Sequence, residues 1–302
     1  MLVWFLLLIL GLAVLVKSSD WFTHAAERLG LRLGISPMVI GVTVVSIGTS
    51  LPELASSIVA VTSDASEIVI GNAFGSNIAN VFLVLALGAI VGKGLAVKAG
   101  RHIDWPFLIV GTLMAIAMLA DRRVTLGESL FLLAVYLLYL FMLVRHESTR
   151  TEKLDTGHPG LLIAILVFSG LFVYLGSRLT VESAVAIAAQ SGISEGAIAA
   201  SIIAIGTSIP ELAVTVVAAW RGRREIAFGN ILGSCIFNLL VVIGASGLFG
   251  IIVVAENVLV VSVVGLVLST LVLLSASLSG RLSRRTGLAL LVLYAVFLIL
   301  LF

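Results

Sequence analysis

The sequence is poor in charged residues and nearly free of cysteine. Only 11% of its 302 residues are Asp, Glu, Lys or Arg, whereas a soluble domain carries about 25%. The hydrophobic share is 60% and the mean hydropathy is +1.23, which excludes an ordinary water-soluble globule. The single cysteine, Cys235, excludes an intramolecular disulfide, and a formal net charge of +2 provides no basic surface for nucleic acid.

Motifs for metalloenzyme and ATP-driven chemistry are also missing. The four histidines are scattered, with no HExxH motif and no pairing with cysteine, so a zinc site has no ligands. No GxxxxGK[ST] phosphate loop occurs, which argues against an ATP-driven pump in this chain. The sequence contains no paired nucleophile and base of the kind that would indicate an intramembrane enzyme. We therefore expect an integral membrane protein that is not an enzyme and uses no cofactor.

Long apolar runs fill most of the chain. A membrane-spanning helix needs about 20 mostly apolar residues, and ten such runs are separated by polar breaks. They cover residues 1–16, 36–61, 68–91, 106–120, 127–145, 160–177, 193–219, 226–248, 255–277 and 287–302. The first run has no basic residue before it and no small-residue cleavage site after it, so we expect a retained helix. The pattern predicts an all-α membrane protein with ten transmembrane helices.

The distribution of basic residues predicts the orientation in the membrane. If both termini lie outside, 15 of the 18 Lys and Arg residues fall in cytoplasmic loops, and only Arg122, Arg123 and Arg178 lie outside. Positively charged loops stay cytoplasmic, so we expect external N- and C-termini. The compact length favours a multi-pass protein of a prokaryotic inner membrane, and we expect it to be a monomer.

The chain contains an internal repeat with an offset of 158 residues. Aligning residues 41–81 with 199–239 needs no gap and gives 18 identities in 41 positions. We predict two halves, 1–145 and 160–302, joined by a cytoplasmic linker at 146–159. Five spans in each half would make the second copy enter the bilayer from the opposite side. Inverted repeats of this kind occur in many secondary transporters, where the substrate lies near the midplane between the halves.

Spans two and seven each contain the motif Gly-Thr-Ser-[Leu/Ile]-Pro-Glu, which ends at Glu53 and at Glu211. Because Pro52 and Pro210 lack an amide hydrogen and clash with the preceding turn, both helices should be broken there. Broken helices are tolerated in a bilayer where their free carbonyls line a polar cavity. A carboxylate at this depth costs at least about 2.5 kcal/mol on insertion scales. Its recurrence at matched positions predicts an oxygen-lined site for a hard cation.

Spans three and eight supply a second matched set of polar residues. Ser76 and Asn80 are four residues apart and share one helix face, and Ser234 and Asn238 do the same in the second half. Glycines with GxxxG spacing accompany both pairs and indicate close helix packing in the membrane. We expect the glycines to bring the helices together and the polar stripes to face the cavity.

The doubled Gly-Thr-Ser-[Leu/Ile]-Pro-Glu and Gly-Asn-x-x-Gly-Ser-x-Ile-x-Asn motifs resemble the α-repeats of the cation/Ca²⁺ exchanger superfamily. They look most like its prokaryotic Na⁺/Ca²⁺ exchanger branch. The resemblance implies exchange of Ca²⁺ for Na⁺ by alternating access, at cation sites that cluster in the centre. By matching motif positions, the implied metal ligands are Ser46, Thr49, Ser50, Glu53, Ser76, Asn80, Ala204 (through its carbonyl), Thr207, Ser208, Glu211, Ser234 and Asn238.

One departure from that family leaves the coupling ion open. Well-known sodium-coupled members have Asp where this chain has Asn238, so the site offers two carboxylates and no third. Proton-coupled relatives also use two acidic residues, and a H⁺-coupled antiporter is the first alternative. The chain nevertheless keeps Ser76 and Ser234 where those relatives commonly carry another acid. A passive cation channel is a further alternative, which the inverted repeat disfavours.

Overall fold

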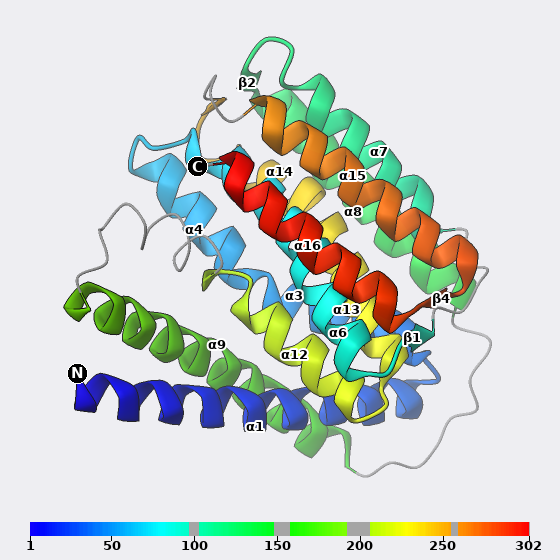
Figure 1. The fold of residues 1–302 in the computed structure, drawn as a ribbon. Coiled ribbons are helices and arrows are strands. Elements are labelled where there is room, and N and C mark those ends of the chain that lie inside the picture. Colours follow the sequence, from blue (N-terminus) through cyan, green and yellow to red (C-terminus); the bar gives the residue numbers. More distant parts are fainter. Residues whose placement is uncertain (97–102, 148–157, 192–205, 255–258, 302) are drawn as a thin grey trace.

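The computed structural model describes residues 1–96, 103–147, 158–191, 206–254 and 259–301. Helices make up nearly all of the described chain (Figure 1). The helices of the first half are α1 (Leu2–Leu33), α2 (Pro37–Ile40), η1 (Gly41–Val45), α3 (Ser46–Thr49), α4 (Leu51–Thr62), α5 (Ile68–Ala79), η2 (Asn80–Leu85), α6 (Ala86–Val91), α7 (Asp104–Ala117) and α8 (Leu126–Glu147). Those of the second half are α9 (Pro159–Gln190), α12 (Ile209–Trp220), α13 (Arg224–Phe237), η4 (Asn238–Val242), α14 (Ile243–Ser246), α15 (Leu259–Ser279) and α16 (Arg284–Leu301). The elements labelled η are π-helical turns.

Two short antiparallel ladders connect the halves. Strand β1 (Leu95–Ala96) pairs with β4 (Arg281–Leu282), and β2 (Arg123–Val124) pairs with β3 (Ile252–Val253). Under the offset of 158 residues β1 corresponds to β3 and β2 corresponds to β4. Each ladder therefore joins one strand from each half.

Helices α1 and α9 run side by side along one edge of the molecule, and the remaining helices form a bundle beside them (Figure 1). The N-terminal amine at Met1 donates a 2.6 Å hydrogen bond to Gln190, so the start of α1 meets the end of α9 and the two helices are antiparallel. Both are longer than the apolar runs 1–16 and 160–177 indicated. Hydropathy marks where the apolar surface ends, whereas α1 continues as a helix until Gly34, whose left-handed conformation (φ 74°) ends it.

The burial pattern is that of a protein in lipid. Five helices of the described residues are long and apolar enough to cross a membrane, and a bent pair is a sixth candidate: Leu2–Leu33, Ile68–Val91, Leu126–Arg145, Pro159–Ile187, Arg224–Ser246, and Pro37–Thr49 with Leu51–Thr62. Their most apolar windows range from 100% buried in Arg224–Ser246 to 22% buried in Leu2–Leu33. The peripheral helices expose large apolar side chains, as lipid contact requires. The predicted count of ten spans stays a prediction.

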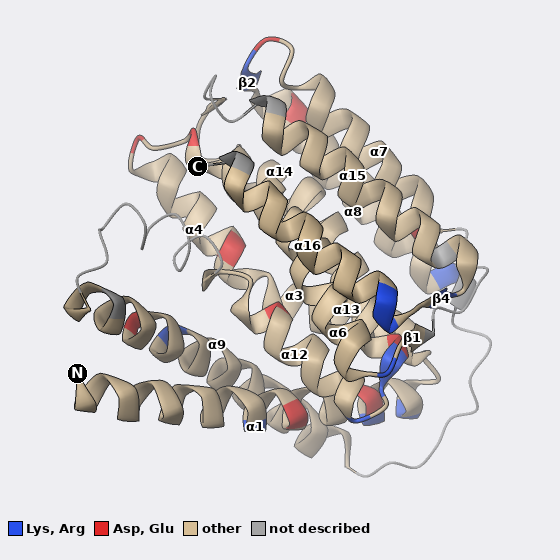
Figure 2. Cartoon of the chain, in the orientation of Figure 1, with Lys and Arg blue, Asp and Glu red and all other residues tan. Residues whose placement is uncertain are grey.

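Charged residues lie mostly at helix ends and in loops, as Figure 2 shows. Acidic residues also occur on α4 and α12, deep inside the bundle (Figure 2). These are Glu53 and Glu211, which are both 0% exposed. The predicted linker, 146–159, falls for the most part outside the described residues, as does the first part of the apolar run 193–219.

Candidate cation site between the halves

A bend at Ser50 places Glu53 at the start of a helix. Helices Pro37–Thr49 and Leu51–Thr62 are bent by 42° at this residue. Pro52 has no amide hydrogen, so the carbonyl of Gly48 loses the partner that a continuous helix would give it. Glu53 lies in the first turn of α4, where the positive end of the helix dipole favours a negative charge.

The second half repeats this local structure. Thr207 and Ser208 form a turn, α12 begins at Ile209, and Glu211 lies in its first turn. The amide of Leu212 donates to the carbonyl of Ser208 at 3.0 Å, as the amide of Leu54 does to Ser50 at 3.2 Å. Both glutamates thus project from matched helix starts. The predicted ligand Ala204 lies outside the described residues.

Contacts of Ser50 bring predicted ligands of the two halves together. Ser50 links the first half to the second, because its hydroxyl donates to Oε1 of Glu211 at 2.8 Å and contacts Oγ of Ser234 at 3.0 Å. Three of the predicted ligands, from both halves, are therefore in direct contact.

Several buried polar atoms around the glutamates have no hydrogen-bond partner among the described residues. They are both carboxylate oxygens of Glu53, Oε2 of Glu211, Oγ of Ser208, Oδ1 of Asn238, and both side-chain polar atoms of Asn80. Buried polar groups are normally paired, and each exception needs an explanation. Bound cations with oxygen ligands would satisfy the oxygens. In the described ranges no group of three or more His, Cys, Asp or Glu side chains is arranged so that it could hold a metal ion, so the candidate site combines two acids with neutral oxygens.

The other predicted ligands of the first half are also buried. Ser46, Thr49 and Ser76 are at most 4% exposed. The hydroxyl of Ser46 donates to the carbonyl of Val42 at 2.5 Å, and that of Thr49 donates to Oδ1 of Asn230 at 3.1 Å. In this structure these two hydroxyls therefore have protein partners. The turn residue Thr207 is partly exposed.

Asn80 and Asn238 each begin a π-helical turn, η2 and η4. Element η4 packs against α4, which carries Glu53, and η2 packs against α12, which carries Glu211. Each π-helical turn thus packs against the helix that carries the glutamate of the other half. Such turns are frequent at functional sites, and hydropathy or motif spacing gives no signal for them.

The contacts of two supporting asparagines became visible only in the structure. Asn230 donates to Thr215 at 3.0 Å while it accepts from Thr49, and Asn72, its repeat counterpart, donates to Ser57 at 2.9 Å. Asn72 and Asn230 are the first asparagines of the two Gly-Asn-x-x-Gly-Ser-x-Ile-x-Asn motifs, but the motif gives no signal for their partners. Asn77, from α5, contacts both Cys235 and Asn238 of the other half. A difference between the repeats, Asn at 77 and Cys at 235, was the available signal.

Helix α13 packs closely against η1 and α3 at Gly233. A Cβ atom added at Gly233 would lie 2.2 Å from the carbonyl oxygen of Val42 and 2.4 Å from Oγ of Ser46, whereas one added at Gly75, its counterpart, would meet no described atom within 4 Å. Gly233 is buried and Gly75 is partly exposed. The matched glycines therefore have different surroundings.

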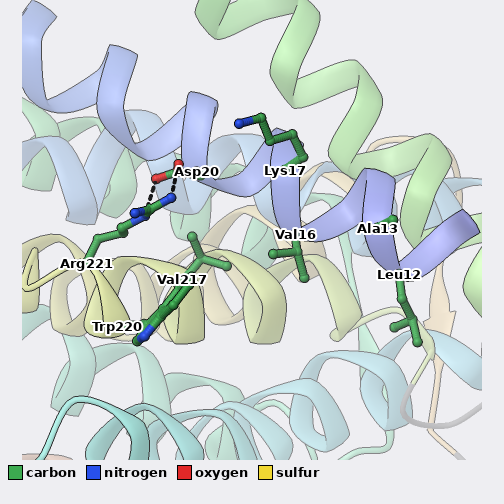
Figure 3. Close-up of a pocket in the computed structure, with 8 residues that line it drawn as sticks. All are labelled: Leu12, Ala13, Val16, Lys17, Asp20, Val217, Trp220 and Arg221. Carbon is green, nitrogen blue, oxygen red and sulfur yellow. Dashed lines mark hydrogen bonds and ion pairs between the residues drawn. The ribbon is translucent and has the colours of Figure 1, made fainter. Parts of the chain in front are cut away.

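An ion-pair cluster joins α1 to the loop between α12 and α13. Figure 3 shows Arg221 and Asp20 beside the pocket between α1 and α12, where Nη2 of Arg221 lies 2.7 Å from Oδ2 of Asp20. Arg223 adds contacts of 3.2 Å to Asp20 and 2.8 Å to Glu27. The corresponding loop of the first half, Thr62–Glu67, contains no Lys or Arg and cannot make such pairs.

Comparison with known proteins agrees with this geometry. The family model described as "Sodium/calcium exchanger protein" matches residues 3–145 and 161–302. The sodium/calcium exchanger MaX1 of Methanosarcina acetivorans is 33% identical, over 99% of this chain and 98% of the relative. The inner membrane protein YrbG of Escherichia coli is 34% identical, over 80% of this chain and 78% of its own length. A solved structure of the sodium-calcium exchanger NCX_Mj, soaked with Na⁺ and Sr²⁺, superposes with a TM-score of 0.82 at 31% identity and covers 95% of each chain.

Proposed function

The chain belongs to the sodium/calcium exchanger family, a family of membrane transporters and not of enzymes, and we propose that it exports Ca²⁺ in exchange for entering Na⁺. The relatives support cation/Ca²⁺ antiport as the general activity. The choice of Na⁺ as the coupling ion is the finer proposal. The name of the relative YrbG supports an inner-membrane location.

One observation carries the proposal: two fully buried glutamates, one from each half, retain unpartnered oxygens. Two carboxylates neutralise one Ca²⁺, whereas three Na⁺ in the same place would leave one positive charge. An exchange of three Na⁺ for one Ca²⁺ would therefore move net charge across the membrane. We assign the ion ligands to Ser46, Thr49, Ser50, Glu53, Ser76, Asn80, Ala204, Thr207, Ser208, Glu211, Ser234 and Asn238.

The proposed architecture has two inverted halves, 1–145 and 160–302, with a cytoplasmic linker at 146–159. Ten spans, of which the second and seventh are broken, would leave both termini outside. Contacts between repeat-related positions support this arrangement. Thr112 and Thr270, exactly one repeat offset apart, meet at 3.0 Å, as residues on a pseudo-twofold axis would.

The burial of matched residues supports a conformation open on the outer side. Asn72 and Gly75, near the loop 62–67 that has no Lys or Arg, are partly exposed, whereas Asn230 and Gly233 are buried near the arginine-rich loop. By the positive-inside rule the closed side faces the cytoplasm. If the two halves swapped these packing arrangements, the cytoplasmic side would open and the outer side would close.

A H⁺-coupled Ca²⁺ antiporter is the second candidate. It is favoured by the presence of only two acids, each of which can take up a proton when the metal leaves. Ca²⁺ uptake into proteoliposomes distinguishes Na⁺ coupling from H⁺ coupling. Proteoliposomes loaded with Na⁺ and diluted into Na⁺-free medium should accumulate labelled Ca²⁺ against its gradient. Equal accumulation driven by a pH gradient without Na⁺ would support the alternative, and the absence of uphill transport would support a channel.

The site assignment is tested by Glu53→Gln and Glu211→Gln. Each removes one of two carboxylates at the proposed ion position and should nearly abolish Ca²⁺ transport in a folded protein. Glu182→Gln is the matched control, because this acid is 52% exposed on α9 and pairs with Arg178. Exchange at the wild-type rate in both site variants would refute the assignment.

A further inference from the structure

Asn77 joins the two halves next to the proposed ion ligands. It lies in the last turns of α5 and is 1% exposed. Its Nδ2 donates to the backbone carbonyl of Cys235 at 3.1 Å, and its Oδ1 accepts from Nδ2 of Asn238 at 3.1 Å. One buried amide thus makes both of its contacts with the other half of the protein.

These two hydrogen bonds fix the orientation of Asn238. A backbone carbonyl can only accept, so it selects the NH₂ group of Asn77 and leaves Oδ1 for the neighbour. Asn238 must then turn its own NH₂ group toward Asn77. Its Oδ1 consequently points away from Asn77, is buried, and has no partner among the described residues. The turn that Asn238 begins, η4, packs against α4, which carries Glu53.

We propose that Asn77 is a positioning residue that holds Asn238 with its carbonyl oxygen toward the transported cation. This inference rests on the proposed exchange at the Glu53–Glu211 site. Without Asn77, the amide of Asn238 can rotate and present NH₂, which repels a cation. Asn77 itself does not touch the ion.

The same contacts favour an amide over a carboxylate at position 238. A carboxylate has no hydrogen to donate, so one of its oxygens would face Oδ1 of Asn77. The repulsion between these two oxygens is relieved only if the side-chain amide of Asn77 flips. The flip breaks its hydrogen bond to the Cys235 carbonyl and places Oδ1 of Asn77 opposite that carbonyl oxygen. The surroundings of Asn238 thus favour a site with two acidic residues and disfavour a third.

The repeat provides a natural comparison. Asn77 and Cys235 are 158 residues apart, so they occupy matched positions, and cysteine cannot orient an amide in the same way. Asn80 is the counterpart of Asn238, and neither polar atom of its side chain has a partner among the described residues. Of the two matched asparagines, only Asn238 is held by a cross-repeat amide.

A double-mutant cycle tests the inference. Asn77→Ala should raise the Ca²⁺ concentration for half-maximal uptake about three- to tenfold, the factor expected for one neutral hydrogen bond, with a smaller change in maximal rate. Ca²⁺-induced thermal stabilisation of purified protein should weaken by a similar factor, which gives a readout without transport. In an Asn238→Ala background, Asn77→Ala should have no further effect on either measurement, because the group that it positions is gone.

Cys235→Ser is the matched control. It changes the counterpart position but keeps the backbone carbonyl that Asn77 contacts, so Ca²⁺ affinity should stay at the wild-type value. Asn77→Leu is the second variant, since it keeps side-chain volume while it removes both hydrogen bonds, and it should reproduce the effect of Asn77→Ala.

The outcomes separate this inference from the proposed function. Wild-type affinity in the Asn77 variants, or equal effects in the Asn238→Ala background, would overturn the positioning role while exchange by the wild-type protein still stands. Failure of both Asn77 variants to fold would also overturn it, because Asn77 would then be a structural residue. Absence of exchange in the wild-type protein would instead refute the proposed function.

Discussion

Replacing Gly233 by alanine tests the close packing that holds the site together. The added Cβ would lie 2.2 Å from the carbonyl oxygen of Val42, 2.7 Å from its Cα, and 2.4 Å from Oγ of Ser46. Two of these three atoms belong to the backbone, so rotation of a side chain cannot relieve the clash. Helix α13 must move away from η1 and α3, which carry Val42 and Ser46.

The change in stability caused by Gly233→Ala follows from two opposing effects. Alanine in a helix is favoured over glycine by about 1 kcal/mol. Overpacking costs about 1–3 kcal/mol and occasionally more, and a contact below 3 Å with backbone belongs at the upper end. Gly233→Ala should therefore be destabilising by about 1–2 kcal/mol on balance. Gly75→Ala should be neutral or stabilising, since no described atom lies within 4 Å of its added Cβ.

The two variants are compared by their melting temperatures in detergent and by their Ca²⁺ exchange rates in vesicles. Gly233→Ala should lower the apparent melting temperature and slow Ca²⁺ exchange, because the shift also moves Ser46, a proposed ligand. Gly75→Ala should match the wild-type protein in stability. Equal melting temperatures for the two variants would refute the argument that these matched glycines differ in packing.

Three further predictions concern the site and its surroundings. Ser50→Ala should raise the KM for Ca²⁺ about tenfold or more, since it removes a hydrogen bond to the Glu211 carboxylate of a kind that contributes about 1.5–3 kcal/mol; uptake at varied Ca²⁺ with an unchanged KM would contradict it. Arg223→Gln should lower the melting temperature more than Arg178→Gln, because the Arg223 side chain is 14% exposed and contacts two acids, whereas that of Arg178 is 64% exposed; equal shifts would argue against the cluster. Asn238→Asp should alter the Na⁺ dependence of exchange, measured as initial rates at varied Na⁺, and an identical dependence would show that position 238 does not set ion preference.

The family was predictable from the sequence because its signal lies in local motifs. Each copy of the motif carries a proline and a glutamate, and neither is tolerated in a bilayer without a special environment. The match of the family model to both halves confirms the predicted family. The bend at Ser50 follows from Pro52, whose chemistry is independent of the rest of the fold.

Other features depend on tertiary contacts, which local motifs do not determine. The GxxxG spacing is the same in both halves, yet Gly233 is tightly packed and Gly75 is not. The contacts of Asn77 depend on how α5 meets α13, which the sequence alone does not determine. The length of α1 was underestimated because Asp20 and Glu27, polar in the sequence, are paired with arginines from a distant loop.

The ion pairs between α1 and the loop after α12 have an energetic consequence for the proposed cycle. In the proposed inverted arrangement the equivalent loop, 62–67, lies on the opposite face and has no arginine, so the two alternating conformers would differ in free energy even with identical cargo. Such a bias shifts their populations and hence the half-saturating concentration seen from each face of the membrane. It leaves the reversal potential unchanged, because that depends on stoichiometry and gradients alone. In the proposed cycle, divergence between the two repeats would thereby give the inside and the outside different affinities without changing which direction of transport is downhill.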